Sequence, residues 1–399
     1  NVQKNIQKQS QQIQKKDYKP EYILNFERTK KSITSIDFHP NNSQIVFSCK
    51  DSHIQIQDLN ETNNLPLTFP KFNLHKGITY CVKYNQKGNI LATSGQDRKI
   101  NIYTNDNNGQ ENQYQDYHII KAHSGGVRSI EFSFNDEFLL SASDDRTLKL
   151  WHGNTRKYLT SFLGHNNVVR MGVFSPDARL IGSCSDDRSI KIWDLQNQKC
   201  IYSINSHSDV VKQSFFSPDG TSVVSCSFDK SIKIHDLRSR KVIQNYQGAH
   251  SEQINCLQVH PSGLFLSSGG SDGKVKIWDM RMCKQTFTVY TSDEEIYALN
   301  YNQDGSCFAT GGSEKTVILW KNEFFEESEQ NMIPQQKGFL QKKKKGSSDK
   351  LDDKDQQQFK DELDNIEENE NVITQALQAS LEYVMAKIDC LQQEFKYSQ

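Results

Sequence analysis

Four similar stretches decide the fold of this chain: SASDDRTLKLW at residues 141–151, SCSDDRSIKIWD at 183–194, SCSFDKSIKIHD at 225–236 and SGGSDGKVKIWD at 268–279. Their shared aspartates, Asp145, Asp187, Asp229 and Asp272, are separated by intervals of 42, 42 and 43 residues. Weaker copies place Asp51 and Asp97 before this group and Glu314 after it, which makes seven repeats. A fixed period of this length is typical of repeat architectures.

Each repeat contains short segments with the apolar and polar alternation of β-strands. In the third repeat these are VRSIEF (127–132), FLLSAS (138–143), LKLW (148–151) and KYLTSF (157–162), and turn signals such as SPDG (217–220) separate the corresponding segments elsewhere. Four short strands in about 42 residues is the period of a propeller blade. The sequence therefore predicts an all-β fold, a seven-bladed β-propeller.

The seventh repeat supplies only three strands, from IYALNY (296–301) to TVILW (316–320). The segment EYILNFE at residues 21–27 can supply the fourth strand. We expect the first and last repeats to share a blade in this way, because closing the ring removes the open sheet edges that promote aggregation.

A histidine lies 22 residues before the repeat aspartate in five repeats: His75, His123, His165, His207 and His250. With the dipeptides Gly164-His165, Trp193-Asp194 and Trp278-Asp279, this pattern resembles the WD40 family. The resemblance implies a buried, hydrogen-bonded tetrad in each blade. It is complete in three repeats, which carry His123, Ser141, Asp145 and Trp151; His165, Ser183, Asp187 and Trp193; and His250, Ser268, Asp272 and Trp278.

Other repeats depart from the tetrad. The second and fifth have Tyr103 and His235 in place of the tryptophan. The first repeat has Thr29, Phe47 and Gln57 at the corresponding positions, and the seventh has Ser292 and Glu314, so we expect broken tetrads there. Terminal repeats are often atypical.

Ser183, His165 and Asp187 could also be interpreted as the catalytic triad of a hydrolase. A catalytic serine must lie exposed in one unique pocket, whereas this constellation recurs in most repeats. We therefore predict a structural role, because a buried aspartate needs the donors that an imidazole and a hydroxyl provide. The chain is predicted to have no enzymatic activity, no catalytic residue and no cofactor.

Composition narrows the class of protein. The formal net charge of the 399 residues is -1; residues 1–19 carry +4 and residues 324–399 carry -6, which leaves +1 for the middle of the chain. This balance favours neither nucleic acid nor a membrane as the partner. The nine cysteines form no C-x-x-C pair, so neither a metal site nor a disulfide framework is predicted, and we expect a reducing, cytoplasmic environment.

Basic residues recur at two positions of the repeats. They follow the repeat aspartate or its substitute as Arg98, Arg146, Arg188, Lys230 and Lys315, and they follow the repeat histidine by five residues as Arg128, Arg170 and Lys212. We expect both sets to lie near one face, where they would suit an acidic protein partner. The alternative is that these residues only solvate turns.

The composition changes after Trp320. Residues 324–369 are charged and low in apolar residues, as expected of a disordered linker. The run Lys342–Lys345 is either a solvated part of this linker, a nuclear signal or a contact for an acidic surface. Residues 370–399 regain a period, with Leu377, Val384 and Leu391 at one heptad position and Leu381, Ile388 and Phe395 at the other. We predict a short coiled coil that links copies of the chain, or alternatively an amphipathic helix that packs on the ring.

The last repeat ends with GGSEKTVILWKNEFF (311–325), and the final helix reads ITQALQASLEYVMAKIDCLQQEF (373–395). With the charged linker between them, they resemble the proteome of centriole protein 1 family. The resemblance implies a structural protein of the cytoskeleton, located at centrioles and basal bodies, that binds microtubule triplet walls and inner-scaffold proteins and supports the formation of cilia. Two other classes stay open: a substrate adaptor or signalling scaffold, and a propeller associated with nucleic acid.

The predicted domain organisation has four parts. Residues 1–20 form a polar extension, residues 21–323 the propeller, residues 324–369 the linker and residues 370–399 the C-terminal helix.

Overall fold

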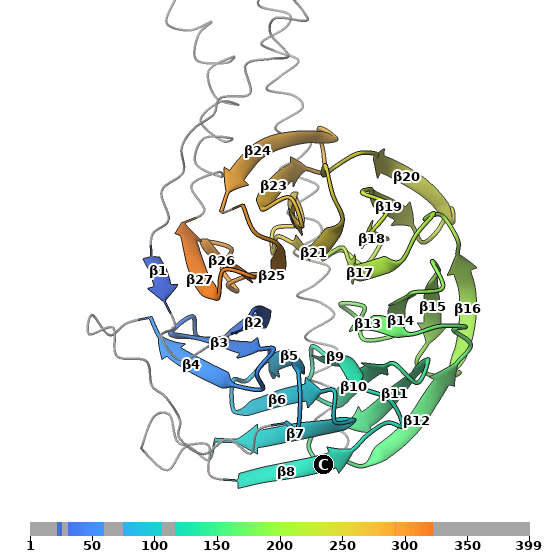
Figure 1. The fold of residues 1–399 in the computed structure, drawn as a ribbon. Coiled ribbons are helices and arrows are strands. Elements are labelled where there is room, and N and C mark those ends of the chain that lie inside the picture. Colours follow the sequence, from blue (N-terminus) through green and yellow to red (C-terminus); the bar gives the residue numbers. More distant parts are fainter. Residues whose placement is uncertain (1–21, 26–30, 60–74, 106–115, 292, 322–399) are drawn as a thin grey trace, which may run out of the picture. The chain divides into compact units, whose positions relative to one another are not determined.

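The computed structural model describes residues 22–25, 31–59, 75–105, 116–291 and 293–321, and in these ranges the regular structure consists of β-strands (Figure 1). The predicted linker and C-terminal helix, and Thr29 and Ser292 of the repeats, lie outside the described residues. All pairings between the described strands are antiparallel. They join strands that are consecutive in the chain, except in the seventh sheet, where the strand Tyr22–Asn25 pairs with the strand Thr316–Lys321.

Seven sheets follow one another along the sequence, each beginning with its innermost strand. The first described sheet contains β2 (Ile33–Phe38), β3 (Gln44–Cys49) and β4 (Ile54–Asp58). The second contains β5 (Thr79–Tyr84), β6 (Ile90–Gly95), β7 (Lys99–Thr104) and β8 (Asp116–Lys121), and the third contains β9 (Val127–Phe132), β10 (Phe138–Ser143), β11 (Thr147–His152) and β12 (Tyr158–Leu163).

The next sheets repeat this order. The fourth contains β13 (Val169–Phe174), β14 (Leu180–Ser185), β15 (Ile190–Asp194) and β16 (Lys199–Ile204), and the fifth contains β17 (Val211–Phe216), β18 (Ser222–Ser227), β19 (Ile232–Asp236) and β20 (Lys241–Tyr246). The sixth contains β21 (Ile254–Val259), β22 (Phe265–Gly270), β23 (Lys274–Asp279) and β24 (Lys284–Tyr290), and the seventh contains β25 (Ile296–Tyr301), β26 (Cys307–Gly312), β27 (Thr316–Lys321) and β1 (Tyr22–Asn25).

The innermost strands contact one another in a closed cycle, β2 with β5, then β9, β13, β17, β21, β25 and again β2 (Figure 1). The seven sheets are therefore the blades of a propeller, as predicted. In the seventh blade, Tyr22 of β1 pairs with Leu319 of β27, and Asn25 pairs with Thr316. The strand nearest the start of the chain is thus held by the last described strand.

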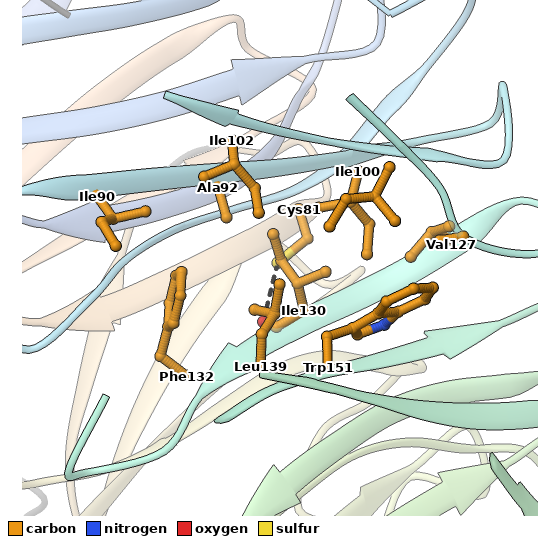
Figure 2. Close-up of a cluster of buried hydrophobic side chains, with 12 residues drawn as sticks. Cys81, Ile90, Ala92, Ile100, Ile102, Val127, Ile130, Phe132, Leu139 and Trp151 are labelled. Atoms are coloured by element: carbon orange, nitrogen blue, oxygen red, sulfur yellow. Dashed lines mark hydrogen bonds between the residues drawn. The ribbon is translucent and has the colours of Figure 1, made fainter. Parts of the chain in front are cut away.

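Separate apolar clusters fill the spaces between adjacent blades. One cluster joins Ile100 and Ile102 of the second blade to Ile130, Leu139 and Trp151 of the third (Figure 2). The β-branched residues in these positions fit the pleated faces of two packed sheets. Middle strands of the blades, such as β14 and β18, are buried at nearly every residue, whereas outer strands such as β16 and β20 are mostly exposed. The ring is therefore stabilised by the packing of the inner parts of adjacent blades.

Candidate functional site

In the second to sixth blades, a repeated network of polar side chains joins the loop before the innermost strand to the turn between the second and third strands. In the fourth blade His165 Nδ1 lies 2.9 Å from Asp187 Oδ2, and His165 Nε2 lies 2.7 Å from Ser183 Oγ. Trp193 Nε1 donates to the same Ser183 hydroxyl at 2.8 Å. The structure therefore brings all four residues of this predicted tetrad together.

The same contacts recur in other blades. The histidine-to-aspartate distances are 2.7 Å for His75–Asp97, 2.8 Å for His123–Asp145, 2.9 Å for His207–Asp229 and 2.9 Å for His250–Asp272. The indole nitrogens of Trp151 and Trp278 donate to Ser141 and Ser268 at 2.9 and 3.0 Å. The fixed interval of 22 residues thus places each histidine beside its aspartate.

The tetrad aspartates are held as carboxylates. Burial alone would raise the pKa of Asp187, but hydrogen bonds from His165 and Ser189 outweigh burial and hold that pKa below its usual range. Asp145, Asp229 and Asp272 show the same balance between burial and the hydrogen bond from their own histidine. Burial also lowers the pKa of His123, despite its bond to Asp145.

A hydroxyl that was not among the predicted tetrad residues completes the network in three blades. Thr147, Ser189 and Ser231 lie two residues after the tetrad aspartate and donate to it at 2.6, 2.5 and 2.6 Å. The signal was present in the sequence, because Asp-x-Ser or Asp-x-Thr recurs in these repeats.

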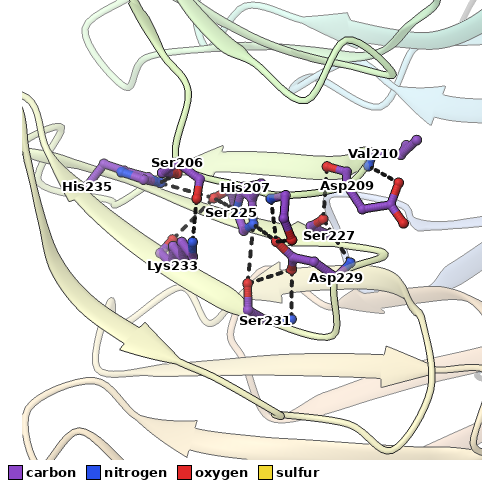
Figure 3. A network of polar contacts seen from close by, with 11 residues as sticks. Ser206, His207, Asp209, Val210, Ser225, Ser227, Asp229, Ser231, Lys233 and His235 are labelled. Atoms are coloured by element: carbon purple, nitrogen blue, oxygen red, sulfur yellow. Dashed lines mark hydrogen bonds and ion pairs between the residues drawn. The ribbon is translucent and has the colours of Figure 1, made fainter.

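Blades that lack the tryptophan fill its place differently. In the fifth blade, His235 Nε2 lies 3.3 Å from Ser225 Oγ (Figure 3). Burial, together with the nearby charges of His207 and Lys233, lowers the pKa of His235 to about 4, so this imidazole is neutral at pH 7. In the second blade, Tyr103 is buried at the equivalent position.

The seventh blade keeps half of a tetrad that was expected to be broken. Trp320 Nε1 donates to Thr310 Oγ1 at 2.9 Å. Both residues have the spacing from Glu314 that serine and tryptophan have from aspartate in complete repeats, but the missing histidine concealed the match. Glu314 itself is exposed, and in the first blade Phe47 and Gln57 are buried where serine and tryptophan would lie.

The geometry of Ser183 does not suit a nucleophile. Its side chain is fully buried, and its hydroxyl contacts both His165 and Trp193. A catalytic serine must be accessible and unique, whereas this arrangement recurs around the ring. The triad geometry is therefore explained by the architecture, and the absence of enzymatic activity stays a prediction.

The basic residues that follow the aspartates occupy tight turns. Arg98, Arg146, Arg188, Lys230 and Lys315 are exposed and have φ values of 70°, 69°, 68°, 66° and 65°. A left-handed backbone at a non-glycine residue is uncommon, so the turn fixes where these side chains begin. Lys230 donates to the backbone oxygen of Ser251 at 2.6 Å.

The second basic set lies on the innermost strands of the third, fourth and fifth blades. Arg128, Arg170 and Lys212 surround a cavity of about 360 Å³ bounded by the innermost strands. Arg128 binds Asp144, two residues before Arg146 in the same turn, through Nε at 2.5 Å and Nη2 at 3.1 Å. This pairing places the cavity at the end of the ring that carries the exposed cations of the turns.

A second cavity, of about 540 Å³, shares Lys83, Glu131, Phe215, Gln258 and Asn300 with the first, so the two meet at these residues. Lys83 Nζ lies 2.8 Å from Asp37 Oδ1 at this junction. Burial raises the pKa of Glu131 to about 7 although Lys83 opposes the shift. The farther cavity is lined by turn residues of the opposite end, Pro40, Phe134, Pro176, Pro218 and Pro261.

The cysteines of the described ranges form no disulfide. Cys184 and Cys226 are buried within strands, and burial raises the pKa of the Cys184 thiol to about 12. Within the described residues no group of histidine, cysteine, aspartate and glutamate side chains has the arrangement of a metal site. None of the described segments is a helix with the length and apolar character needed to cross a membrane.

Comparison with known proteins defines the class. A model of the family described as "WD domain, G-beta repeat" matches seven segments, residues 20–58, 68–104, 114–152, 156–194, 198–236, 240–279 and 281–321. The chain is therefore a WD40-repeat protein and belongs to this family. The WD40 propeller domain of Doa1 superposes with a TM-score of 0.66 at 22% sequence identity, over 77% of this chain and 97% of that one, and this likeness confirms the fold.

Curated relatives match only parts of the chain. E3 ubiquitin-protein ligase COP1 of Pisum sativum is 29% identical over 147 residues, which are 36% of this chain and 20% of that protein. WD repeat-containing protein 1 of Mus musculus is 33% identical over 95 residues, 24% of this chain and 15% of that protein. Nuclear distribution protein PAC1 of Candida dubliniensis is 26% identical over 140 residues, with 35% and 27% covered. The chain thus spans less than a third of each relative.

Proposed function

We propose that this WD40 protein is a non-enzymatic structural scaffold of centrioles and basal bodies. In this role the ring binds tubulin of the microtubule triplets, or an inner-scaffold protein attached to them, and supports basal-body assembly and cilium formation. The observation that carries the proposal is the ring itself. Seven blades, five of which contain a buried histidine–aspartate network, form a rigid body whose loops and turns are available for binding.

The assignment to centrioles rests on the resemblance of residues 311–325 and 373–395 to the proteome of centriole protein 1 family. Residues 370–399 would link copies of the chain, so that several weak contacts of individual rings add up to stable attachment. No chemical step is needed for this function.

Localisation tests the proposal. The tagged chain, imaged in ciliated cells together with a marker of basal bodies, is expected to concentrate in the marked foci and to remain there after soluble protein has been washed out. A diffuse distribution in the cytoplasm or nucleus would contradict the centriolar role and leave the fold unaffected. A version that lacks residues 370–399 separates attachment by the ring from linkage of copies.

A second candidate is a substrate adaptor or signalling scaffold. It is favoured by the match to COP1, which is named as an E3 ubiquitin-protein ligase, although the match covers only 20% of that protein. An adaptor is expected to co-purify with a ubiquitin ligase at stoichiometric levels and to alter the abundance of a bound protein when it is removed. A nucleic-acid role is less favoured, because the charge of the ring is close to zero.

A further inference from the structure

Each innermost strand of the propeller contains a bulge at the same place. In the third blade Val127 pairs with Ser143 and Ser129 pairs with Ala142, so that Arg128 between them has no partner in the ladder. The same skip in pairing occurs in the other six blades. A bulge redirects the side chain of its extra residue. Seven side chains are therefore redirected at one level of the ring: Thr34, Tyr80, Arg128, Arg170, Lys212, Asn255 and Tyr297.

These seven positions are not equivalent in charge. All but Asn255 line the 360 Å³ cavity, and the three cations, Arg128, Arg170 and Lys212, come from three consecutive blades. We call these three residues the basic arc. Lys50 of the first blade also lines the cavity, with its Nζ 4.3 Å from the ring centroid of Tyr297.

The cations of the cavity differ in how far they are neutralised. Arg170 binds Asp186 through Nε at 2.5 Å and Nη2 at 2.8 Å, and Arg128 binds Asp144 in the same way. A guanidinium has five N–H donors, so each arginine retains further donors. Lys212 forms no ion pair within the described part of the chain, and its Nζ lies 6.0 Å from the ring centroid of Phe228.

Lys212 is also crowded by like charge. Burial, followed by the charges of Arg170 and Arg128, lowers the pKa of Lys212 to about 8. An anion placed among these three residues would relieve the repulsion and give Lys212 an anionic partner. The charges around the cavity therefore favour the binding of an anion at this end of the ring.

We propose that this cavity receives the carboxylate side chains of an acidic peptide segment of a partner protein, held by the basic arc and Lys50. The inference deepens the proposed function, because it rests on the ring being a protein-binding platform and names the chemistry of what it binds. Carboxylates match both the planar donors of arginine and the ammonium groups of lysine.

Two observations favour a peptide over a small polyphosphate. First, positive charge continues outside the cavity, because the exposed Arg98, Arg146, Arg188, Lys230 and Lys315 lie on turns at the same end of the ring. A chain that leaves the cavity therefore meets further cations. Second, the apolar side chains of Ile78, Met171 and Leu257 also line the cavity, and a partly apolar lining suits peptide side chains better than a dense cluster of phosphates.

The binding of a fluorescein-labelled hexaglutamate peptide to the full chain, measured by fluorescence anisotropy at low salt, tests the proposal. We expect Lys212→Gln to weaken binding roughly tenfold, as for the loss of one charge-assisted contact, and Lys50→Gln to weaken it further in the double variant. Because the chain has other lysines, including Lys342–Lys345, the loss of affinity on substitution is the informative readout rather than binding alone.

Lys199→Gln is the matched control. Lys199 is exposed at the start of β16, outside the cavity, and its substitution removes the same charge. Equal weakening by Lys199→Gln and Lys212→Gln would overturn the proposal, because it would show that only net charge matters. Labelled hexaglutamine is expected not to bind. Inorganic tripolyphosphate tests whether the ligand is a phosphate instead. If it displaces the peptide from the wild type, binds more tightly than the peptide and depends more strongly on Lys212, the peptide assignment is overturned in favour of a phosphate ligand.

The inference and the proposed function fail separately. If hexaglutamate binding does not depend on Lys212 but the tagged chain still concentrates at basal bodies, the cavity assignment is wrong and the scaffold role stands. If binding depends on Lys212 but the tagged chain is diffuse, the cavity assignment stands and the centriolar role is wrong.

Discussion

At the scale of single residues, each tetrad aspartate couples two strand connections of its blade, the loop before the innermost strand and the turn between the second and third strands. Asp187 accepts from His165 and Ser189 and also from the backbone nitrogen of Asn166 at 2.9 Å. Its removal would leave several donors without an acceptor. A buried donor without a partner costs more than the net gain of one hydrogen bond.

We therefore predict that Asp187→Ala lowers the free energy of unfolding at pH 7 by about 1 to 3 kcal/mol, as measured by urea titration. The depressed pKa of Asp187 means that its contribution is present above about pH 4, the ordinary aspartate range, and is lost as the pH falls toward the folded-state value. The destabilisation should thus shrink in acid. Asp209→Ala is the control, because Asp209 is exposed and its carboxylate accepts a hydrogen bond from the neighbouring Val210 nitrogen. An equal loss there would contradict the tetrad explanation.

The imidazole of His235 gives the fifth blade a sensitivity to pH. Its pKa of about 4 in the folded chain lies below the value of about 6.5 in the unfolded chain. The unfolded state therefore binds more protons between these values, and stability is lost as the pH falls from about 6.5 to 4, by roughly 3 kcal/mol from this group. Replacement with tryptophan restores the indole found in neighbouring blades.

We predict that His235→Trp reduces the loss of stability between pH 7 and pH 4.5, measured by urea unfolding at both values. His118→Gln serves as the control, because His118 is an exposed residue of β8. If the loss of stability on acidification were the same in His235→Trp as in the wild type, the assignment of this sensitivity to His235 would be incorrect.

The residues of the tetrads could be predicted from the sequence because spacing and chemistry both repeat. Thr310 and Trp320 were missed since their blade lacks the marker histidine, although their hydrogen bond is intact. The basic arc illustrates a different limit. Its members were found by their distance from the histidines, but the bulges that set their side chains around one cavity depend on a pairing shift that residue alternation does not reveal.

At the scale of secondary-structure elements, the closure of the ring by β1 can be tested most directly. Strand β1 has four residues, and its partner β27 would become an open edge without it. The sequence predicted this pairing, because the last repeat contains three strand segments whereas a full repeat contains four. The fourth strand of the first blade could not be compared in the same way, because residues 60–74 lie outside the described ranges.

We predict that deletion of residues 1–27 lowers the melting temperature of the chain by at least about 5 °C, measured by differential scanning calorimetry, and increases aggregation through the open edge of β27. Deletion of residues 1–19 keeps the strand and should leave the melting temperature within about 1 °C of the wild type. Equal behaviour of the two truncated chains would show that β1 does not close the ring.

At the scale of the whole molecule, the fold class follows from the sequence, since seven repeats of one period allow few other architectures. The partner does not follow, because WD40 rings of similar geometry serve unrelated functions. COP1 and PAC1 both match parts of this chain but carry different names. What distinguishes one ring from another lies in a few side chains and in the segments attached to the ring.

The C-terminal segment is predicted to make the chain oligomeric through Leu377, Leu381, Val384, Ile388, Leu391 and Phe395. Sedimentation equilibrium of the full chain should give a mass above that of the 45.9 kDa monomer that rises with concentration. The double variant Leu381→Asp and Ile388→Asp should return it to the monomer mass by placing charge in the seam. A wild-type mass equal to the monomer at every concentration would favour the alternative, a helix that packs on the ring.

The pairing of β1 with β27 also has a consequence for biosynthesis. Asn25 and Thr316 are partners, so the ring cannot close on the ribosome until almost 300 further residues have been translated. At typical rates of about 5 to 20 residues per second, the first strand waits on the order of 15 to 60 seconds for its partner. During that interval the completed blades end in an open sheet edge, and we expect the chain to need the most protection from aggregation in this period of synthesis.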